Sequence, residues 1–327
     1  MKCLVTGAAG FIGSHLCDRL IEDGHDVVGI DDLSNGKVNN LSVATKSPRF
    51  HMILGNINGE LMDHGPILNG TEWIFHLAAK ADLIPSIERP LDYHKTNVTG
   101  TIRVLELARK LKIKRFIYAA SSSMYGIPSE YPTSERCEAR PLHPYALTKL
   151  IGDYYVNHWS YVYNLPTTSL RIFNAYGPRH RTSGAYGAVF GVFLSQLANG
   201  LPLTIVGDGK QLRDFVYISD VVEAFVLAAR GCEGSYNVGS GNPRSVNELA
   251  LLLGAKDFIH IPDRPGEPRI THADITLIVD QLGWKPRVSF EEGVEIMRGE
   301  IPKYKNAPLW TKEKIEKATE SWFKYLS

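Results

Sequence analysis

Cysteine is scarce in this sequence. The 327 residues include four cysteines, and no two of them form a CxxC pair: Cys3, Cys17, Cys137 and Cys232. This spacing argues against a disulfide framework or a cysteine-based metal cluster, and it is typical of a reducing cytoplasm. Long apolar runs are also missing, because the longest, at about residues 188–194, is too short to span a bilayer. Since the N-terminus does not resemble a signal peptide, we expect a cytoplasmic protein with no membrane partner.

An excess of charge of either sign is absent as well. Lysine and arginine number 36 and aspartate and glutamate 35, which gives a formal net charge of +1. A nucleic-acid-binding protein usually has a basic surplus or a basic block, so nucleic acid is not an expected partner. The 11 histidines form no metal-ligand spacing such as HExxH, and we expect no metal site. The composition, 22% charged and 44% hydrophobic, is that of a globular protein of about two domains.

Short apolar segments alternate with amphipathic segments in the first half of the chain. Buried strands are predicted at the apolar segments, residues 2–5, 27–30, 52–54, 73–77, 116–118 and 169–173. Helices are predicted between several of them, at residues 12–23, 98–112 and 145–163. Fully apolar strands that alternate with helices predict an α/β fold, with a Rossmann-like, doubly wound parallel sheet that helices cover on both faces.

Three glycines follow the first predicted strand and open the first predicted helix. Gly7, Gly10 and Gly13 permit a tight turn and allow the backbone to approach a pyrophosphate at the positive end of a helix. Asp31 ends the second predicted strand, 24 residues after Gly7, where a carboxylate can bind the two ribose hydroxyls of an adenosine. Because this charge would repel a 2′-phosphate, the pattern favours NAD over NADP as the cofactor.

The second half of the chain has a different pattern, rich in loops. Short helices are predicted at residues 187–200, 218–229 and 246–253. We therefore predict that residues 1–175 form an NAD-binding Rossmann domain, with later segments interleaved, and that residues 176–327 form a smaller α/β substrate domain. A last helix is predicted at residues 311–326, where one face, packed in the core or in an interface, carries Ile315, Ala318, Trp322, Phe323 and Leu326.

A YxxxK pattern places Tyr145 and Lys149 on one face of a predicted helix. The ammonium group can stabilise a tyrosinate and lower the pKa of Tyr145 from about 10 toward neutrality. The tyrosine can then act as general base for a sugar hydroxyl while hydride leaves for NAD. The pattern is common by chance, and it gains weight from the serine-rich segment at residues 120–126, which ends a predicted strand and can supply a hydroxyl that shares the substrate proton.

These motifs together resemble the extended branch of the short-chain dehydrogenase/reductase superfamily, whose members act on nucleotide sugars. The resemblance implies that Ser121 is the proton-sharing hydroxyl, with Tyr145 and Lys149 as the other catalytic residues. The sequence departs from the family pattern at Asn56, where an aspartate is usual, and at Lys80, where a Gln or Leu is more usual. We assign no role to Lys80. The implied cofactor-binding residues are Gly7, Gly10, Phe11, Ile12, Gly13, Asp31, Asn35, Asn56, Ile57, Leu77, Ala78, Ala79, Lys80, Asn97, Tyr145 and Lys149.

The substrate side of the family pattern is present too. An RxxNxYGP segment at residues 171–178 and a GDGKQLRDF segment at residues 207–215 resemble the loops that contact the diphosphate of the sugar nucleotide. The guanidinium group suits that contact because it binds phosphate in a bidentate way. The implied substrate-binding residues are Ser122, Ser123, Asn174, Arg213, Arg264 and Glu267.

The shared chemistry of this family is oxidation at C4 of the sugar. Many 4,6-dehydratases carry an Asp-Glu pair after the catalytic Thr, whereas this chain has Ser122 and Ser123, which are not strong acids or bases. This favours a 4-epimerase of an NDP-hexose or an NDP-N-acetylhexosamine. Against this, residues 81–87, 181–191 and 307–311 resemble a bacterial subgroup that includes 4,6-dehydratases of the legionaminic-acid pathway, so the dehydratase stays as the alternative.

Two further alternatives are a non-catalytic NAD-binding regulator and a net dehydrogenase. The nucleotide remains open among UDP, GDP and dTDP. The resemblance also implies a homodimer, held by the segments around residues 93–111 and 145–163.

Overall fold

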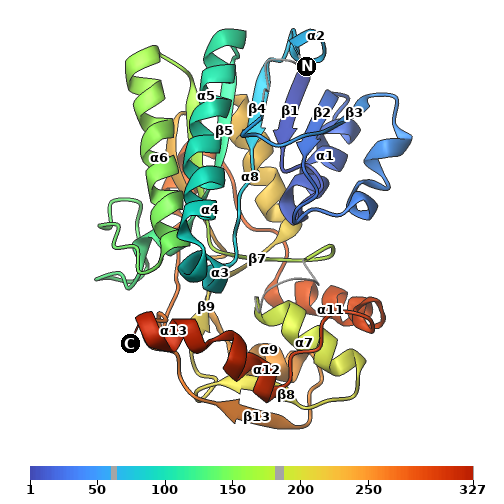
Figure 1. Ribbon diagram of the computed structural model, residues 1–327, viewed down its shortest axis with the longest axis vertical. Coiled ribbons are helices and arrows are strands. Elements are labelled where there is room, and N and C mark those ends of the chain that lie inside the picture. Colours follow the sequence, from blue (N-terminus) through green and yellow to red (C-terminus); the bar gives the residue numbers. More distant parts are fainter. Residues whose placement is uncertain (60–64, 181–187, 327) are drawn as a thin grey trace.

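The computed structural model describes residues 1–59, 65–180 and 188–326, and a seven-stranded sheet lies at its centre (Figure 1). Every neighbouring pair of its strands is parallel, in the order β11-β6-β5-β4-β1-β2-β3. The strands are β1 (Lys2–Thr6), β2 (Asp26–Asp31), β3 (Phe50–Leu54), β4 (Trp73–His76), β5 (Arg115–Ser121), β6 (Thr167–Ile172) and β11 (Gly234–Val238). This order is that of a Rossmann sheet with one added strand, so the predicted fold class is confirmed.

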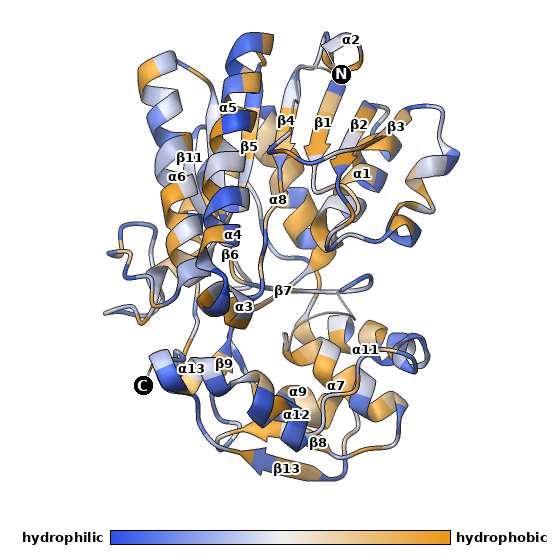
Figure 2. Cartoon of the chain, in the orientation of Figure 1, coloured by the Kyte–Doolittle hydropathy of each residue, from blue (hydrophilic) through white to orange (hydrophobic). Residues whose placement is uncertain are grey.

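Helices cover both faces of the sheet because the apolar strands bury side chains on both sides. In β1, Cys3 and Val5 pack into one core together with Leu16 of α1 (Phe11–Glu22), whereas Leu4 packs into a second core with Val104 of α5 (Gly100–Leu111). The first face also carries α8 (Ile218–Arg230), and the second carries α4 (Pro90–His94) and α6 (Pro144–Tyr163) (Figure 1). Figure 2 shows β1 and β2 mostly orange, α5 with much blue on the side toward the viewer, and α6 paler with orange turns.

Most of the remaining elements form a second, smaller layer of structure at the carboxyl ends of the sheet strands (Figure 1). They include three two-stranded sheets, in which β7 pairs with β10, β9 with β12 and β8 with β13. Their bounds are β7 (Asn174–Tyr176), β8 (Leu203–Val206), β9 (Leu212–Arg213), β10 (Phe215–Tyr217), β12 (Arg244–Ser245) and β13 (Phe258–Ile261). The layer also contains α7 (Val189–Ala198), α9 (Val246–Leu252) and α11 (Phe290–Glu300). Helix α2 (Gly65–Leu68) lies at the opposite end of the sheet, near the N-terminus, and α3 (Leu83–Glu88) and α10 (Thr276–Leu282) follow β4 and β13 in the chain.

The C-terminal segment differs from its prediction. The single helix predicted at residues 311–326 is two helices, α12 (Lys312–Ala318) and α13 (Glu320–Tyr325). Thr319 separates them, because its buried hydroxyl donates to the carbonyl oxygens of Ile315 at 2.8 Å and Glu316 at 3.1 Å and so ends the first helix. Ile315 and Trp322 are buried as predicted, whereas Phe323 is 38% exposed and does not belong to the buried face.

Residues 181–187 lie outside the described part of the chain. They include most of one segment that resembles the dehydratase subgroup and the predicted first residue of the helix at residues 187–200, which is observed as α7 from Val189.

Candidate active site

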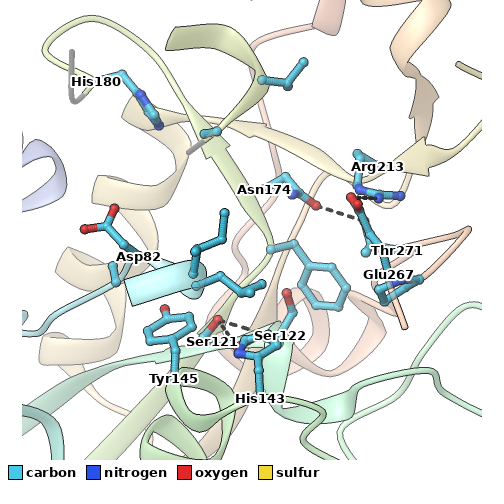
Figure 3. Close-up of a pocket in the computed structure, with 18 of the residues that line it drawn as sticks. Asp82, Ser121, Ser122, His143, Tyr145, Asn174, His180, Arg213, Glu267 and Thr271 are labelled. Carbon is cyan, nitrogen blue, oxygen red and sulfur yellow. Dashed lines mark hydrogen bonds and ion pairs between the residues drawn. The ribbon is translucent and has the colours of Figure 1, made fainter. Parts of the chain in front are cut away.

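A cavity of about 660 Å³ lies where the carboxyl ends of the sheet strands face the second layer. Segments far apart in the sequence line it, from the glycine turn after β1 to Trp322 near the C-terminus. The close-up in Figure 3 shows two opposed groups of polar side chains, one made of Ser121, Ser122, His143 and Tyr145 and the other of Asn174, Arg213, Glu267 and Thr271. Such a mixture of apolar walls and convergent polar groups is typical of a small-molecule site.

The glycine turn forms one wall of this cavity. Gly7 has a φ of +72°, and a Cβ there would lie 2.8 Å from the backbone nitrogen of Ala78. Gly13 is needed for close approach, because its Cβ would lie 2.1 Å from the carbonyl oxygen of Gly7. Gly10, Phe11 and Ile12 complete the wall, with Phe11 and Ile12 in the first turn of α1. The turn therefore leaves backbone N–H groups at the positive end of a helix, as a pyrophosphate requires.

Asp31 ends β2 beside this turn. Its carboxylate accepts hydrogen bonds from the backbone N–H of Ala9 at 3.0 Å and of Leu33 at 2.8 Å. Burial raises the pKa of Asp31, and these two hydrogen bonds oppose that rise. Asn56 lies nearby and donates from its side-chain amide to Asp32 at 2.7 Å. The acidic end of β2 and the glycine turn thus lie together, in the arrangement that a ribose next to a pyrophosphate needs.

The HLAA segment at residues 76–79 is held in place by polar contacts below the cavity. His76 is buried, and its ring nitrogens hydrogen-bond to the hydroxyls of Thr6 at 2.7 Å and Thr101 at 3.0 Å. Asn97 accepts from the backbone N–H of Lys80 at 2.8 Å and donates to the Lys80 carbonyl at 2.9 Å. Asn97 thus holds the backbone that follows the HLAA segment. Lys80 is held through its backbone.

The predicted catalytic hydroxyls meet at the end of β5. Tyr145 is hydrogen-bonded to Ser121, and the Ser121 hydroxyl lies 2.9 Å from that of Ser123. The two side chains lie at the ends of their elements: Ser121 is the last residue of β5, and Tyr145 is in the first turn of α6. His143 begins that helix, and its Nδ1 accepts from the backbone N–H of Ala146 at 3.2 Å. The three hydroxyls Ser121, Ser123 and Tyr145 line the cavity.

The pKa of Tyr145 differs from the sequence-based expectation. Burial raises the pKa of Tyr145 above its ordinary value, the hydrogen bond with Ser121 lowers it, and the charge of Asp82 raises it further. The expected lowering by Lys149 is not found. The Lys149 ammonium instead lies 4.5 Å from the centre of the Tyr118 ring, and burial lowers its own pKa from 10.5 to about 7, against the attraction of Asp153.

An ion-paired cluster forms the opposite wall. Arg213 and Glu267 are joined by an ion pair of 2.6 Å, and Arg264 lies 3.5 Å from the other oxygen of the same carboxylate. Asn174, at the start of β7, accepts from the hydroxyl of Thr271 at 2.9 Å. All five side chains line the cavity, so two guanidinium groups and an amide converge on it about one carboxylate.

The structure brings most of the predicted site residues together. The predicted residues that line the cavity are Gly7, Gly10, Phe11, Ile12, Gly13, Asn35, Leu77, Ala79, Ser121, Ser122, Ser123, Tyr145, Asn174, Arg213, Arg264 and Glu267. Seven predicted residues do not line it: Asp31, Asn56, Ile57, Ala78, Lys80, Asn97 and Lys149. Of these, Asp31, Ile57, Asn97 and Lys149 are buried. Asp31 contacts the glycine turn, so its place beside the cavity still suits a ribose.

Sequence reasoning missed several cavity residues. Asp82 precedes α3 and His143 precedes α6, and both line the cavity with Tyr145. His143 stacks on Tyr145 with an interplanar angle of 7°, and burial lowers its pKa to about 4. His143 carries an N-cap signal, since it stands directly before Pro144 at the first helical position. Trp322 had no signal, because its place depends on the fold of the last residues.

Within residues 1–59, 65–180 and 188–326, no helix has the length and apolar character needed to cross a bilayer. In the same ranges no three His, Cys, Asp or Glu side chains are grouped as metal ligands would be.

The fold and the cavity suit an enzyme that binds a dinucleotide beside a second ligand, one that contains phosphate. Residues 3–239 match the model of the NAD dependent epimerase/dehydratase family. The chain is 40% identical to the UDP-glucose 4-epimerase of Mycolicibacterium smegmatis, over 90% of this chain and 96% of that protein. The chain therefore belongs to the NAD-dependent epimerase/dehydratase family, and its cofactor is NAD.

Solved structures give the same assignment. The UDP-glucose 4-epimerase of Thermotoga maritima, solved with UDP-glucose, is 36% identical and superimposes with a TM-score of 0.87, covering 93% of this chain and 99% of its own. The dTDP-glucose 4,6-dehydratase DesIV of Streptomyces venezuelae, solved with NAD, is 28% identical with a TM-score of 0.84, covering 92% and 97%. Because an epimerase and a dehydratase share this fold, similarity alone does not separate the two reactions.

Proposed function

We propose that this protein is an NAD-dependent 4-epimerase of a nucleotide-linked hexose or N-acetylhexosamine. One observation carries the proposal: Ser121, Ser122, Ser123 and Tyr145 face the same cavity as the glycine turn and the Arg213–Glu267 pair. Only hydroxyl groups follow the strand at the position where many dehydratases have two carboxylic acids. A site of this kind suits proton transfer at a single sugar hydroxyl.

Tyr145 is the group that exchanges the proton of the sugar 4-hydroxyl. It accepts the proton as C4 is oxidised and returns it when C4 is reduced on the other face, so the protein is unchanged after one turnover. Ser121, hydrogen-bonded to Tyr145, lies where it can share that proton. Bound NAD would supply the hydride acceptor and a positive charge. Burial raises the pKa of Tyr145, and a nearby positive charge would favour its ionised form.

The ion-paired cluster is the proposed diphosphate site. Arg213 and Arg264 present guanidinium groups to the cavity, and a diphosphate would take the place that Glu267 now has between them. Glu267 would then be available for a ribose hydroxyl of the nucleotide. Asn174 and Thr271, which are hydrogen-bonded to each other, lie beside these groups as further polar contacts.

The alternative is a 4,6-dehydratase, and one observation favours it. Dehydration needs an acid or base at C5 and C6 besides the C4 machinery, and Asp82 lines the cavity close enough for its charge to influence Tyr145. His143 lines it as well, and its lowered pKa keeps the ring neutral at neutral pH, so it is a hydrogen-bond donor rather than an acid. The epimerase reaction needs no acid or base at C5 and C6, and it is the function that we favour.

Incubation with UDP-, GDP- and dTDP-hexoses and their N-acetyl forms separates the two reactions. The epimerase gives a product of unchanged mass with altered H4 couplings in NMR spectra. A product that has lost one water would contradict the epimerase and assign Asp82 as the first residue to replace. Steady accumulation of NADH would instead reveal a net dehydrogenase, and tight NAD binding without any turnover would reveal a regulator.

Two further parts of the proposal concern organisation. We assign residues 1–175, with later segments, to NAD and residues 176–327 to the nucleotide sugar. We also propose a homodimer through the segments around residues 93–111 and 145–163, which include α5 and α6. Three large side chains at seven-residue spacing lie exposed on α6, namely Leu147, Tyr154 and Tyr161, and Tyr161 is 86% exposed. A stripe of this kind along one helix suits packing against the same helix of a second copy.

A further inference from the structure

The last twenty residues of the described chain contact three segments that line the cavity. We call residues 307–326 the C-terminal strap. At its start, Ser195 and Gln196 of α7 donate to the carbonyl oxygens of Pro308 at 3.1 Å and Trp310 at 2.7 Å. Helix α7 itself lines the cavity through Val189, Val192 and Phe193. The strap is thus fixed at one end to a helix that faces the ligand.

At its other end the strap reaches the loop at residues 262–268, which carries Arg264 and Glu267 of the ion-paired cluster. The indole N–H of Trp322 in α13 donates to the carbonyl oxygen of Pro265 at 2.7 Å. The Arg264 guanidinium lies 5.7 Å from the centre of the same indole ring. Trp322 is buried, and it also lines the cavity. One side chain therefore contacts both the backbone of this loop and the guanidinium group that the loop presents.

The chain turns sharply directly after Arg264. Pro265 and Gly266 follow it, and Gly266 has a φ of +69°, in the left-handed region that a side chain rarely adopts. Glu267 comes next and bridges Arg213 at 2.6 Å and Arg264 at 3.5 Å. A diphosphate that displaces Glu267 would remove this bridge, and the contact with the indole ring would remain to orient Arg264.

The strap also reaches the cofactor side. Ser321, beside Trp322, donates to Glu88 of α3 at 3.1 Å. Helix α3 follows the HLAA segment, and its first residues, Leu83 and Ile84, line the cavity. The short helix α13 thus contacts both the loop that carries Arg264 and helix α3, which follows the HLAA segment.

We infer that Trp322 is a positioning residue for the nucleotide sugar, holding Arg264 and its loop in the orientation that binds the diphosphate. This inference rests on the proposed function. Loss of both contacts would let Arg264 and its loop leave the binding orientation, and it is therefore expected to weaken nucleotide binding about tenfold, which corresponds to about 1.4 kcal/mol. The affinity for NAD, held by the opposite wall, is expected to stay the same.

The test is a double-mutant cycle with Trp322→Ala and Arg264→Gln, measured by calorimetric titration with UDP, GDP and dTDP. Each variant is also titrated with NAD, and KM and kcat are measured on the sugar substrate. We expect Trp322→Ala to raise the Kd of the preferred nucleotide and the KM about tenfold, with kcat within about twofold. In the Arg264→Gln background the same change is expected to have little effect, because the group that Trp322 orients is gone.

Two variants guard against a trivial result. Tyr325→Ala changes an aromatic residue of the same helix that is 61% exposed, and it should leave all constants unchanged. Trp322→Phe keeps a ring under Arg264 but loses the N–H donor, so it should fall between wild type and alanine even if Trp322→Ala does not fold. Equal losses in both Arg264 backgrounds, or equal losses of NAD and nucleotide affinity, would overturn the inference alone. A wild-type protein that binds none of the three nucleotides would overturn the proposed function itself.

Discussion

The buried charge of Lys149 destabilises the folded protein, and replacing Lys149 should raise the free energy of unfolding. Its ammonium is buried beneath the active site, and burial lowers its pKa from 10.5 to about 7. This difference of about 3.5 pKa units, at 1.36 kcal/mol each, corresponds to an upper limit of about 5 kcal/mol. The contact with the Tyr118 ring returns part of that cost. We therefore expect Lys149→Met to raise the free energy of unfolding of the cofactor-free protein by about 2–4 kcal/mol at neutral pH.

The sign of the pH dependence follows from the direction of the shift. Because the folded protein binds this proton less tightly than the unfolded chain, the cost is fully present below pH 7 and disappears as the pH rises to 10.5. The stabilisation by Lys149→Met should accordingly shrink by about 3 kcal/mol between pH 6.5 and pH 9.5. Turnover should be lost in the same variant, because the family resemblance implies that Lys149 is a catalytic and cofactor-binding residue.

Urea unfolding of the cofactor-free protein at a series of pH values measures this. Exposed Lys256 is a matched control, and Lys256→Met should change the free energy of unfolding by less than about 0.5 kcal/mol at every pH. The reasoning is refuted if Lys149→Met is no more stable than wild type, or if its stabilisation is the same at pH 6.5 and pH 9.5.

Other predictions follow from the same site. Tyr145→Phe should lower turnover about 10²- to 10⁴-fold while NAD affinity, measured by titration, stays the same; near-normal turnover would refute the catalytic assignment. Asp31→Ala should weaken NAD and reduce the discrimination against NADP, whereas equal wild-type affinity for both would contradict the ribose contact. Gly13→Ala should abolish NAD binding, because its Cβ would lie 2.1 Å from the Gly7 carbonyl oxygen. Tyr161→Glu should turn a dimer into a monomer in light scattering; a wild-type monomer at micromolar concentration would count against the dimer.

Much of this molecule could be predicted from local patterns. The alternation of apolar strands with helices predicted the Rossmann sheet, since a strand buried on both faces leaves a continuous apolar run. Cavity residues that belong to a short local motif, such as Gly7 and Ser121, were also predictable, because each motif stands at the end of a predicted strand. These features depend on a few neighbouring residues, and so a single sequence records them.

What the sequence could not predict depends on distant contacts. Thr319 ends α12 because its hydroxyl is buried against the preceding turn, and nothing in the helical pattern of residues 311–326 records that burial. The orientation of Lys149 toward Tyr118 rather than Tyr145 depends on how α6 packs on β5. Trp322 lines the cavity through a bond to Pro265, 57 residues earlier in the chain. Spacing along the sequence carries no information on such pairs.

The return of β11 to the edge of the large sheet constrains how this enzyme can be recombined. Strand β6 pairs with β11, which follows it only after the chain has built β7 to β10 and α7 of the second layer. A fragment that stopped at residue 175 would therefore have an unpaired edge strand and lack α8 over one face. A hybrid enzyme that takes its substrate side from a relative must have more than one crossover point in the gene, placed on both sides of the α8–β11 segment.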